Sequence, residues 1–508
     1  MACASIDLSR VPRMPRWLRQ PRHAGRAWYY PLTLASGSDP RHESRVVFLA
    51  SRLRALAAAF ARLLAPPLLQ PLAATLAPPP ELALPFGPHR RHPCIMWRRS
   101  RQDAASSMEA SRAEAGAPAA DDRLLTPRFV RVTAANFFFF LNFASFFLLP
   151  LHIRALGGSE RTIGLVMGTS GVAGLAAVVV IAAVLDRVGC RLFLLAGIAT
   201  MGAASAAFLF VHAIGPAMYL LRIVQGLAFA AAFNAASTLA VVFAPATRRA
   251  AALGLFGVST LTTHALAPAF GEMLIAVAGF RALFVVAAAF SAVSLAIAWT
   301  VPEAPAPKRR PGGGAGLAAT RDIVSALGTV CGCGVAFGTV VTYIPTFTRD
   351  ERLGPVAVFF LAYTAAAVMS RVLGGGLGDA RGHRPVTIVA LGLFSVSVAA
   401  LAAARSTLGL AGAGLLFGTA QGIVYPTLNA FTVERVPVEE LGRAQTFYNG
   451  AFNLGTTTGS LALGHVAERA GHRMMFLIAA AVVATAFVVF SVGTGARFRE
   501  PRRTHPGR

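Results

Sequence analysis

Long apolar stretches separated by short polar turns make up the chain from about residue 129 onward. Each stretch runs for roughly 20 residues, the length that crosses the hydrocarbon core of a bilayer as an α-helix. We count twelve such stretches, at 130–153, 162–185, 192–213, 216–244, 251–276, 280–301, 323–347, 354–378, 384–404, 408–433, 443–467 and 472–495. The pattern predicts an all-α integral membrane protein with twelve transmembrane helices.

A polar segment divides these stretches into two sets of six. The segment, 302–322, is rich in Pro, Gly and charged residues, which is typical of a flexible linker. It separates an N-terminal half, 108–301, from a C-terminal half, 323–495, and a polar tail, 496–508, ends the chain. Six helices, a linker and six helices are the organisation of a duplicated transporter.

Residues of the two halves also match at a constant spacing. Asp186 and Asp379 are 193 positions apart, and four other pairs share this spacing: Gly189 and Gly382, Arg191 and Arg384, Gly257 and Gly450, Gly271 and Gly464. A constant offset across a whole half indicates an internal repeat. We therefore expect two pseudo-symmetric six-helix bundles.

The first 107 residues differ in composition from the rest, with many Arg, few acids and a Pro-rich run. Within them, the apolar stretch 46–64 contains Arg52, Arg54 and Arg62, so we do not expect it to span a membrane. It can lie on a membrane surface as an amphipathic helix, and an Arg-rich, acid-poor start is also typical of an organelle transit peptide. Because Met108 opens a short polar leader, we favour a disordered extension, or one that precedes the true translation start, without a packed domain.

Composition agrees with a membrane protein. Hydrophobic residues make up 55% of the chain and charged residues 14%, with a mean hydropathy of +0.59, whereas soluble proteins are about 25% charged. The formal net charge is +25, and nearly all of the basic residues are Arg, which lie in short loops and at the two ends of the chain. Nucleic-acid binding needs a solvated basic face, so we expect no nucleic-acid partner.

The position of these arginines predicts the orientation. Most lie on the side that carries the linker, both termini and two charged turns at 181–191 and 373–384. The positive-inside rule places that side in the cytoplasm. We expect a multi-pass protein of the cell inner (plasma) membrane with both termini cytoplasmic.

Several chemistries are disfavoured. The chain has five cysteines, and Cys331 and Cys333 lie in an apolar stretch without metal-ligand spacing, so we expect no metal site. There is no Gly-x-x-x-x-Gly-Lys motif, which argues against an ATP-driven pump. The apolar stretches show no cluster of His or acids, so we expect no enzyme.

The two charged turns repeat one pattern. Asp186 and Asp379 end apolar runs, where a carboxylate can cap free N–H groups, and Gly189 and Gly382 permit a tight turn. The basic residues beside them can pair with these carboxylates or hold the turn at the lipid headgroups: Arg187, Arg191, Arg381 and Arg384.

This pattern resembles the loop signature of the major facilitator superfamily: Gly, three residues, Asp, a basic residue, any residue, Gly, any residue, a basic residue. The second copy begins at Gly375 and has Ala380 at the first basic position, and the first copy has Ala182 in place of Gly. The resemblance covers about residues 125–495. It implies turns that latch the two halves on the cytoplasmic side in the outward-open state; the alternative is a helix cap and topology anchor only.

Two arginines lie inside apolar stretches, where an unpaired charge is costly. Arg222, followed by Gly226, resembles the helix-4 motif of the superfamily, which implies a role in proton coupling. The segment that contains Arg371 is similar to the sequence of the sugar-efflux and drug-efflux branch of the superfamily. Snorkelling towards the membrane surface or structural pairing is the alternative for both.

Pro268 and Gly271 mark a kink and a close-packing position in the fifth stretch. They resemble the helix-5 signature associated with antiporters and exporters, although Ala267 replaces the usual Gly. This resemblance favours export over import.

Other polar residues inside the stretches are candidates for the substrate path. Each can instead bond to a neighbouring helix: Asn142, Gln225, Asn234, His264, Tyr343, Gln421, Tyr425 and Asn429. His264 and Glu272 can change charge, so either is a candidate proton carrier. The first stretch contains no acid, which argues against a dedicated cation pump.

The sequence thus predicts a secondary active transporter of a small organic solute (a sugar, drug or metabolite), working by proton-coupled efflux with alternating access. The implied partners are the solute, protons and the lipid bilayer, with a proton gradient as energy source, no cofactor, and a monomer as the working form. The alternatives are an uptake permease or uniporter for a sugar or organic anion, and a non-transporting membrane sensor or scaffold.

Overall fold

The computed structural model describes residues 125–494, apart from 246–247, 305–319, 375 and 438–439. Within the described helices, the side chains of 179–180, 182–188 and 250 are not described. The predictions for the extension 1–107, the tail 496–508, Gly375 and most of the linker therefore lie outside the described residues. So do those for the side chains of Asp186 and Arg187.

The first half is built from helices joined by short turns. Helix α4 continues through the 3-10 turn η3 into α5, and α7 ends in a second 3-10 turn, η4. The bounds are α4 Pro127–Ser145, η3 Phe146–Leu148, α5 Leu149–Ala155, α6 Glu160–Val188, α7 Cys190–Ala207, η4 Phe208–Phe210, α8 Pro216–Phe243 and α9 Arg249–Trp299.

The second half repeats this plan. Its bounds are α10 Arg321–Asp350, α11 Val356–Gly374, α12 Leu377–Arg381, α13 His383–Ala403, α14 Thr407–Val433 and α15 Leu441–Gly493. Side-chain oxygens of Thr126, Thr320 and Ser406 accept N–H bonds in the first turns of α4, α10 and α14, and so define where these helices begin. The described residues contain no strand.

Ten of the described helices are long and apolar enough to cross a membrane, but two of them have twice the usual length. α9 breaks at Gly279, where φ is 75°, and α15 breaks at Gly471, where φ is 81°. Only glycine adopts such angles freely. Each long helix is therefore two crossings, which confirms the twelve predicted spans within a few residues of their expected ends.

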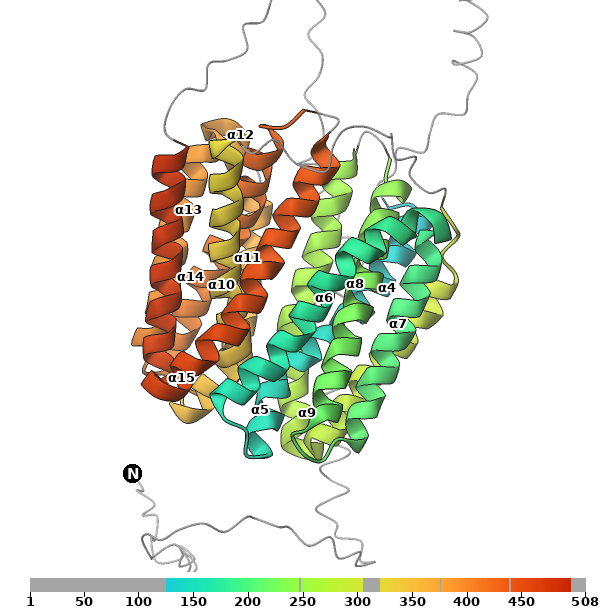
Figure 1. Cartoon of the computed structure of the whole chain (residues 1–508), viewed down its shortest axis with the longest axis vertical. Helices are drawn as coiled ribbons and strands as arrows, with labels where there is room; N and C mark the ends of the chain where they lie inside the picture. The colour runs from blue at the N-terminus through green and yellow to red at the C-terminus, as the bar shows by residue number, and fades with distance from the viewer. Residues whose placement is uncertain (1–124, 246–247, 305–319, 375, 438–439, 495–508) are drawn as a thin grey trace, which may run out of the picture. The chain divides into compact units, whose positions relative to one another are not determined.

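The internal repeat is visible in the backbone. Gly189 and Gly382 hold φ of 95° and 85° at equivalent turns. A Cβ on Gly226 of α8 would meet the backbone of Ser170 in α6, and one on Gly422 of α14 would meet Ser370 in α11. The same close helix contact thus occurs in each half, and Figure 1 shows the two bundles in separate colour ranges.

Figure 1 shows α5 at one end of the two helix bundles and α12 at the opposite end, so we call these the α5 end and the α12 end. Helix α6 of the first half packs against α15 of the second, and α9 packs against α11. Gly168 and Gly171 of α6 face Leu461 and Thr457 of α15 without an intervening side chain of their own.

Candidate functional site

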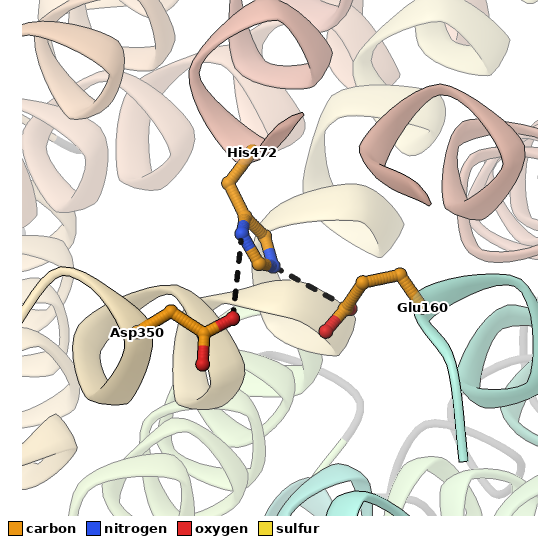
Figure 2. Close-up of side chains that lie close together, drawn as sticks. All are labelled: Glu160, Asp350 and His472. Atoms are coloured by element: carbon orange, nitrogen blue, oxygen red, sulfur yellow. Dashed lines mark ion pairs between the residues drawn. The ribbon is translucent and has the colours of Figure 1, made fainter. Parts of the chain in front are cut away.

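An ion-pair network joins the two halves at the α5 end, and Figure 2 shows its three central side chains. Glu160 is the first residue of α6 and is only 4% exposed. His472 follows the break at Gly471, and its Nε2 lies 3.4 Å from Oε2 of Glu160. Asp350, the last residue of α10, lies 3.9 Å from Nδ1 of the same imidazole. A buried carboxylate of one half thus faces an imidazole of the other.

Arg154 and Thr346 complete this network. Nη1 of Arg154 lies 3.4 Å from Glu160, and Nη2 donates to Asp350 at 3.0 Å. The Thr346 hydroxyl donates to Glu160 at 3.2 Å and lies 3.2 Å from Nε2 of His472. One arginine and two carboxylates give a net charge of −1 with a neutral imidazole and 0 with a protonated one. Protonation of His472 therefore turns its two carboxylate contacts into ion pairs.

The same residues also raise the question of a metal. The ligand atoms of Glu160, Asp350 and His472 lie within 4.8 Å of one another. Arg154 already lies against both carboxylates, and a metal ion would have to displace it. The arrangement therefore fits an ion-pair network better than a metal centre. Sequence analysis missed the network because its members lie far apart in the chain, beside the ends of different helices.

Glu272 makes a second link between the halves. Its carboxylate oxygens accept the N–H groups of Val356 at 3.0 Å and Ala357 at 2.9 Å, at the start of α11. A helix N-terminus has free N–H groups and a partial positive charge, so it stabilises a carboxylate there. This contact explains how an acid is accommodated in α9 near its Gly279 break.

Arg473 ties together three chain segments of the second half at the same end. It donates to Glu351 at 2.7 Å and to the carbonyl oxygens of Ala402 and Ala404 at 2.6 and 3.1 Å. The hydrogen bond and the charge of Arg473 lower the pKa of the Glu351 carboxyl below its ordinary value. Both side chains are about one-third exposed, so water weakens this pair.

A second group of side chains lies between α9 of the first half and the helices of the second half. We call it the central cluster and define it as His264, Phe337, Tyr363, Arg371, Gln421, Tyr425 and Phe452. The His264 ring stacks against Tyr363 with centroids 6.3 Å apart and also contacts Phe147 and Phe337. Tyr425 packs edge-on against Phe452 at 5.1 Å, and Phe452 lies 5.5 Å from Phe337.

Four polar atoms of the central cluster are buried without a hydrogen-bond partner among the described residues. They are His264 Nδ1, Tyr363 Oη, Arg371 Nε and Gln421 Oε1. Tyr363 is 1% exposed, Gln421 7% and His264 8%. Native proteins leave few such atoms unpaired, and each one costs roughly 1–3 kcal/mol. Their concentration in one place marks the central cluster as the candidate binding site.

Helix geometry explains why these groups face one another. Tyr363 and Arg371 are eight residues apart on α11, so they lie on one helix face. Gln421 and Tyr425 are four apart on α14, and Phe417, one turn before Gln421, contacts Tyr363 at 5.5 Å. Arg371 faces the first half, because its Nη1 lies 3.4 Å from the position that a Cβ on Gly257 of α9 would take.

Arg222, predicted inside a span, is confirmed as buried there, at 5% exposure. It donates to Oε1 of Gln225 at 2.8 Å and to the Ser170 hydroxyl at 2.6 Å, and also to the carbonyl oxygens of Val166 and Met167. All these partners are neutral. In this structure Arg222 therefore clamps α8 to α6, and its described bonds reach no titratable group.

The other predicted path residues lie apart from the central cluster. Asn142 bonds to Ala287 and Ser291 and accepts from Ser205, so it joins helices of the first half. Asn234 donates to Ala230 one turn earlier in its own helix. Tyr343 is fully buried and donates to the Ser460 carbonyl oxygen between α10 and α15. Asn429 keeps an unpartnered Oδ1 in α14.

The structure supports the close-packing part of the helix-5 prediction, and the backbone of α9 departs from helical angles at Gly279 rather than at Pro268. Pro268 lies inside α9 and is buried. A Cβ on Gly271 would lie 2.8 Å from Leu148 and 2.9 Å from Leu283, so glycine permits this close approach.

The described part of the two signature turns bonds within each half. Arg191 donates to the Trp299 carbonyl oxygen at 2.8 Å, and Arg384 donates to the Ser491 carbonyl oxygen at 3.0 Å. Asp379 lies 3.5 Å from His383, whose other ring nitrogen lies 2.7 Å from Glu434, and Arg381 is exposed. These contacts fit the anchoring interpretation of the turns. No side chain caps α7, α12 or α13 at its first residue, so the described residues do not show the predicted cap.

Sequence analysis missed several members of the site. The sequence does not distinguish three aromatic residues of the site from the others in the apolar stretches: Tyr363, Phe337 and Phe452. Their role as site residues follows from the side chains that they contact in the folded chain. Asn449, which accepts from Tyr425 at 2.8 Å and Gln445 at 3.4 Å, was also overlooked. Its spacing from Gln445, one helical turn, was the signal available.

Known proteins resemble this chain over most of its described length. A sequence profile described as Major Facilitator Superfamily matches residues 132–361 and again 355–507. A multi-drug resistance efflux pump of Streptococcus pneumoniae is 29% identical over 28% of this chain and 38% of its own length. A probable chloroplastic anion transporter of Oryza sativa is 34% identical over 19% of this chain and 18% of its own length. The chain thus matches well under half the length of these curated relatives.

Solved structures share the fold at low sequence identity. The nucleoside transporter NupG aligns with a TM-score of 0.57 at 15% identity, covering 73% of this chain and all of its own. A bacterial homolog of the human lysosomal transporter Spinster, solved inward-facing and unoccupied, gives 0.61 at 13% identity, over 72% and 96% of the two chains. With the profile matched in both halves and twelve crossings in two bundles, the chain is a multi-pass membrane protein that belongs to the Major Facilitator Superfamily.

Proposed function

We propose that this chain is a proton-coupled secondary transporter that exports a small organic solute by alternating access. The proposal rests on one observation, the position of the bonds between the two halves. Within the described residues, the hydrogen bonds and ion pairs between the halves lie at the α5 end, around Glu160 and Glu272. Two bundles held at one end can rock about a site between them and expose it to each side in turn.

The proposed state is inward-facing. The arginine-rich turns lie at the α12 end, so the positive-inside rule supports placing that end, and both termini, in the cytoplasm of a plasma-membrane protein. The ion-pair network then closes the outer side. The fold shared with a structure solved inward-facing is consistent with this assignment.

Proton coupling needs a buried group that changes charge between the two states. The described candidates are Glu160 and His472 in the ion-pair network and His264 in the central cluster. Export is favoured by the helix-5 residues Pro268 and Gly271 and by the short match to an efflux pump. A proton gradient would drive transport without a cofactor, by a single chain.

A reversible cross-link tests alternating access directly. A Cβ on Gly171 of α6 would lie 3.1 Å from Cβ of Thr457 in α15, so a small outward shift of the helices brings the pair to the roughly 3.5–4.5 Å found in disulfides. In a chain whose own cysteines are replaced by alanine, Gly171→Cys with Thr457→Cys should lock the α5 end when oxidised. Reconstituted in vesicles with an imposed pH gradient, the reduced chain should move protons when one class of sugar, organic acid or amphiphilic cation is added, and the oxidised chain should not.

Equal transport by the locked and reduced chains would refute rocking about this contact. Solute exchange without proton movement would instead support the second candidate, a uniporter or uptake permease. That candidate is favoured by one observation, the bonding of Arg222 to neutral groups only.

A further inference from the structure

We propose that the transported solute is an organic anion with a planar apolar body, bound in the central cluster with its negative charge on Arg371. This inference rests on the proposed function and narrows it to a substrate class. It follows from three separate properties of the central cluster: its unpaired polar atoms, its charge and its rings.

The unpaired polar atoms supply a set of donors with one acceptor. The Nε of Arg371 and the hydroxyl of Tyr363 can donate, His264 Nδ1 can donate or accept, and Gln421 Oε1 accepts. Arginine and tyrosine donors match the oxygens of a carboxylate, and bonds to a charged acceptor are the stronger kind. Gln421 Oε1 is left to receive an N–H or O–H from the body of the solute.

The charge of the surrounding helices has one sign. Arg371, in the last turn of α11, is the cation of the central cluster, and the described acids of the crossing helices lie elsewhere. Glu160, Asp350 and Glu272 are engaged at the α5 end, and Asp379 contacts His383 at the α12 end. A cation entering the central cluster would meet Arg371 without a carboxylate to offset it, whereas an anion would neutralise that charge.

The rings define the body of the solute. Phe337, Tyr425 and Phe452 are half-buried and form a continuous row of ring contacts that begins beside Tyr363, which lies 6.4 Å from Phe337. Aromatic rings pack face to edge or offset against other planar groups. Tyr363 and Arg371 are separated by about 12 Å along α11, from a rise of 1.5 Å per residue. A solute that reaches from Arg371 towards His264 and Tyr363 is therefore elongated rather than compact.

A matched charge series tests this inference. Indole-3-acetate, indole-3-acetamide and tryptamine share the indole ring system with its N–H, and they carry a negative, a neutral and a positive end respectively. We expect the acid to bind the purified full chain about ten- to a hundredfold more tightly than the amide, since a charged bond is worth about 1.5–3 kcal/mol. Tryptamine should bind no more tightly than the amide. Binding is measured by thermal stabilisation in detergent and by counterflow in vesicles.

Substitutions assign the preference to one residue. Arg371→Gln should bring the acid and the amide to equal affinity, Arg371→Lys should keep part of the preference, and Arg321→Gln, at an exposed arginine that starts α10, should keep all of it. A chain that prefers the amide or tryptamine, or fails to bind the acid at 10 mM (about the weakest useful affinity), refutes the substrate class. So does an Arg371→Gln chain that still prefers the acid. The test of the disulfide lock at Gly171 and Thr457 uses sugars, organic acids and amphiphilic cations. A sugar or cation that moves protons only in the reduced chain would therefore refute the substrate class while supporting the transport proposal.

Discussion

Replacing Glu160 by Gln tests whether the ion-pair network holds the two halves together at the α5 end. The amide keeps the size of the side chain and an oxygen that can accept from Thr346. It removes the negative charge that faces Arg154 and His472, each at 3.4 Å. We therefore expect the α5 end to open more often.

The size of the effect follows from distance and exposure. Two unit charges 3.4 Å apart attract by about 5 kcal/mol at an effective dielectric constant of 20. Arg154 is 40% exposed, and removing Glu160 and its partners from water costs much of this attraction. The net loss should be about 1–2 kcal/mol, which shifts the equilibrium towards the open α5 end by roughly 5- to 30-fold.

The disulfide between Gly171→Cys and Thr457→Cys provides the assay, because it forms only when the α5 end is closed. In the Glu160→Gln chain, the fraction cross-linked under limiting oxidant should fall. Glu468→Gln is the matched control, since Glu468 is an exposed carboxylate in α15 near the same end. Unchanged cross-linking in the Glu160→Gln chain, or an equal loss in the control, would refute the reasoning.

Three further predictions concern stability. Arg222→Lys should destabilise the chain by about 1–3 kcal/mol, because an ammonium group lacks the planar fork that donates to α6 and Gln225; a lower melting temperature in detergent checks this. Gly226→Ala should lower that temperature because its Cβ meets the α6 backbone, whereas Gly254→Ala, with nothing within 4 Å, should not. The lowered pKa of Glu351 means that its contribution is present above the ordinary Glu pKa and is lost as pH falls through the lower folded value. Arg473→Gln should remove this small acid dependence of the melting temperature.

The twelve crossings could be predicted because bilayer thickness fixes helix length, and each crossing leaves a long apolar run. The breaks at Gly279 and Gly471 were also placed within a few residues, since Arg281 follows the first glycine and charged or polar residues lie on both sides of the second. The ion-pair network could not be predicted, because Glu160, Asp350 and His472 meet only after the two bundles pack together. Glu160 lay just outside the predicted second span, so its burial was missed.

The two interior arginines show the same limit. The cost of a charge in the membrane correctly marked Arg222 and Arg371 as unusual. Their environments differ for reasons that the sequence does not show. Arg222 bonds to backbone carbonyl oxygens of α6, and because every residue has such a group, no residue type announces this partner. Arg371 instead keeps an Nε without a hydrogen-bond partner among the described residues. A pattern of residue types can identify an exceptional position, but the partner of that position depends on helix packing.

The glycines that line α6 where it meets α15 have a mechanical consequence. Side chains that interlock between helices must change rotamer before the helices can slide, and this produces friction. Gly164, Gly168 and Gly171 offer no such side chain to Ser460, Leu461 and Thr457 on the opposite helix. Only α15 therefore contributes side chains to this contact, and those of Leu461 and Thr457 fill the space that the glycines leave. Fewer side chains must change rotamer when the two helices slide, so the contact resists movement little, while the charges at the α5 end supply the attraction that keeps that end closed.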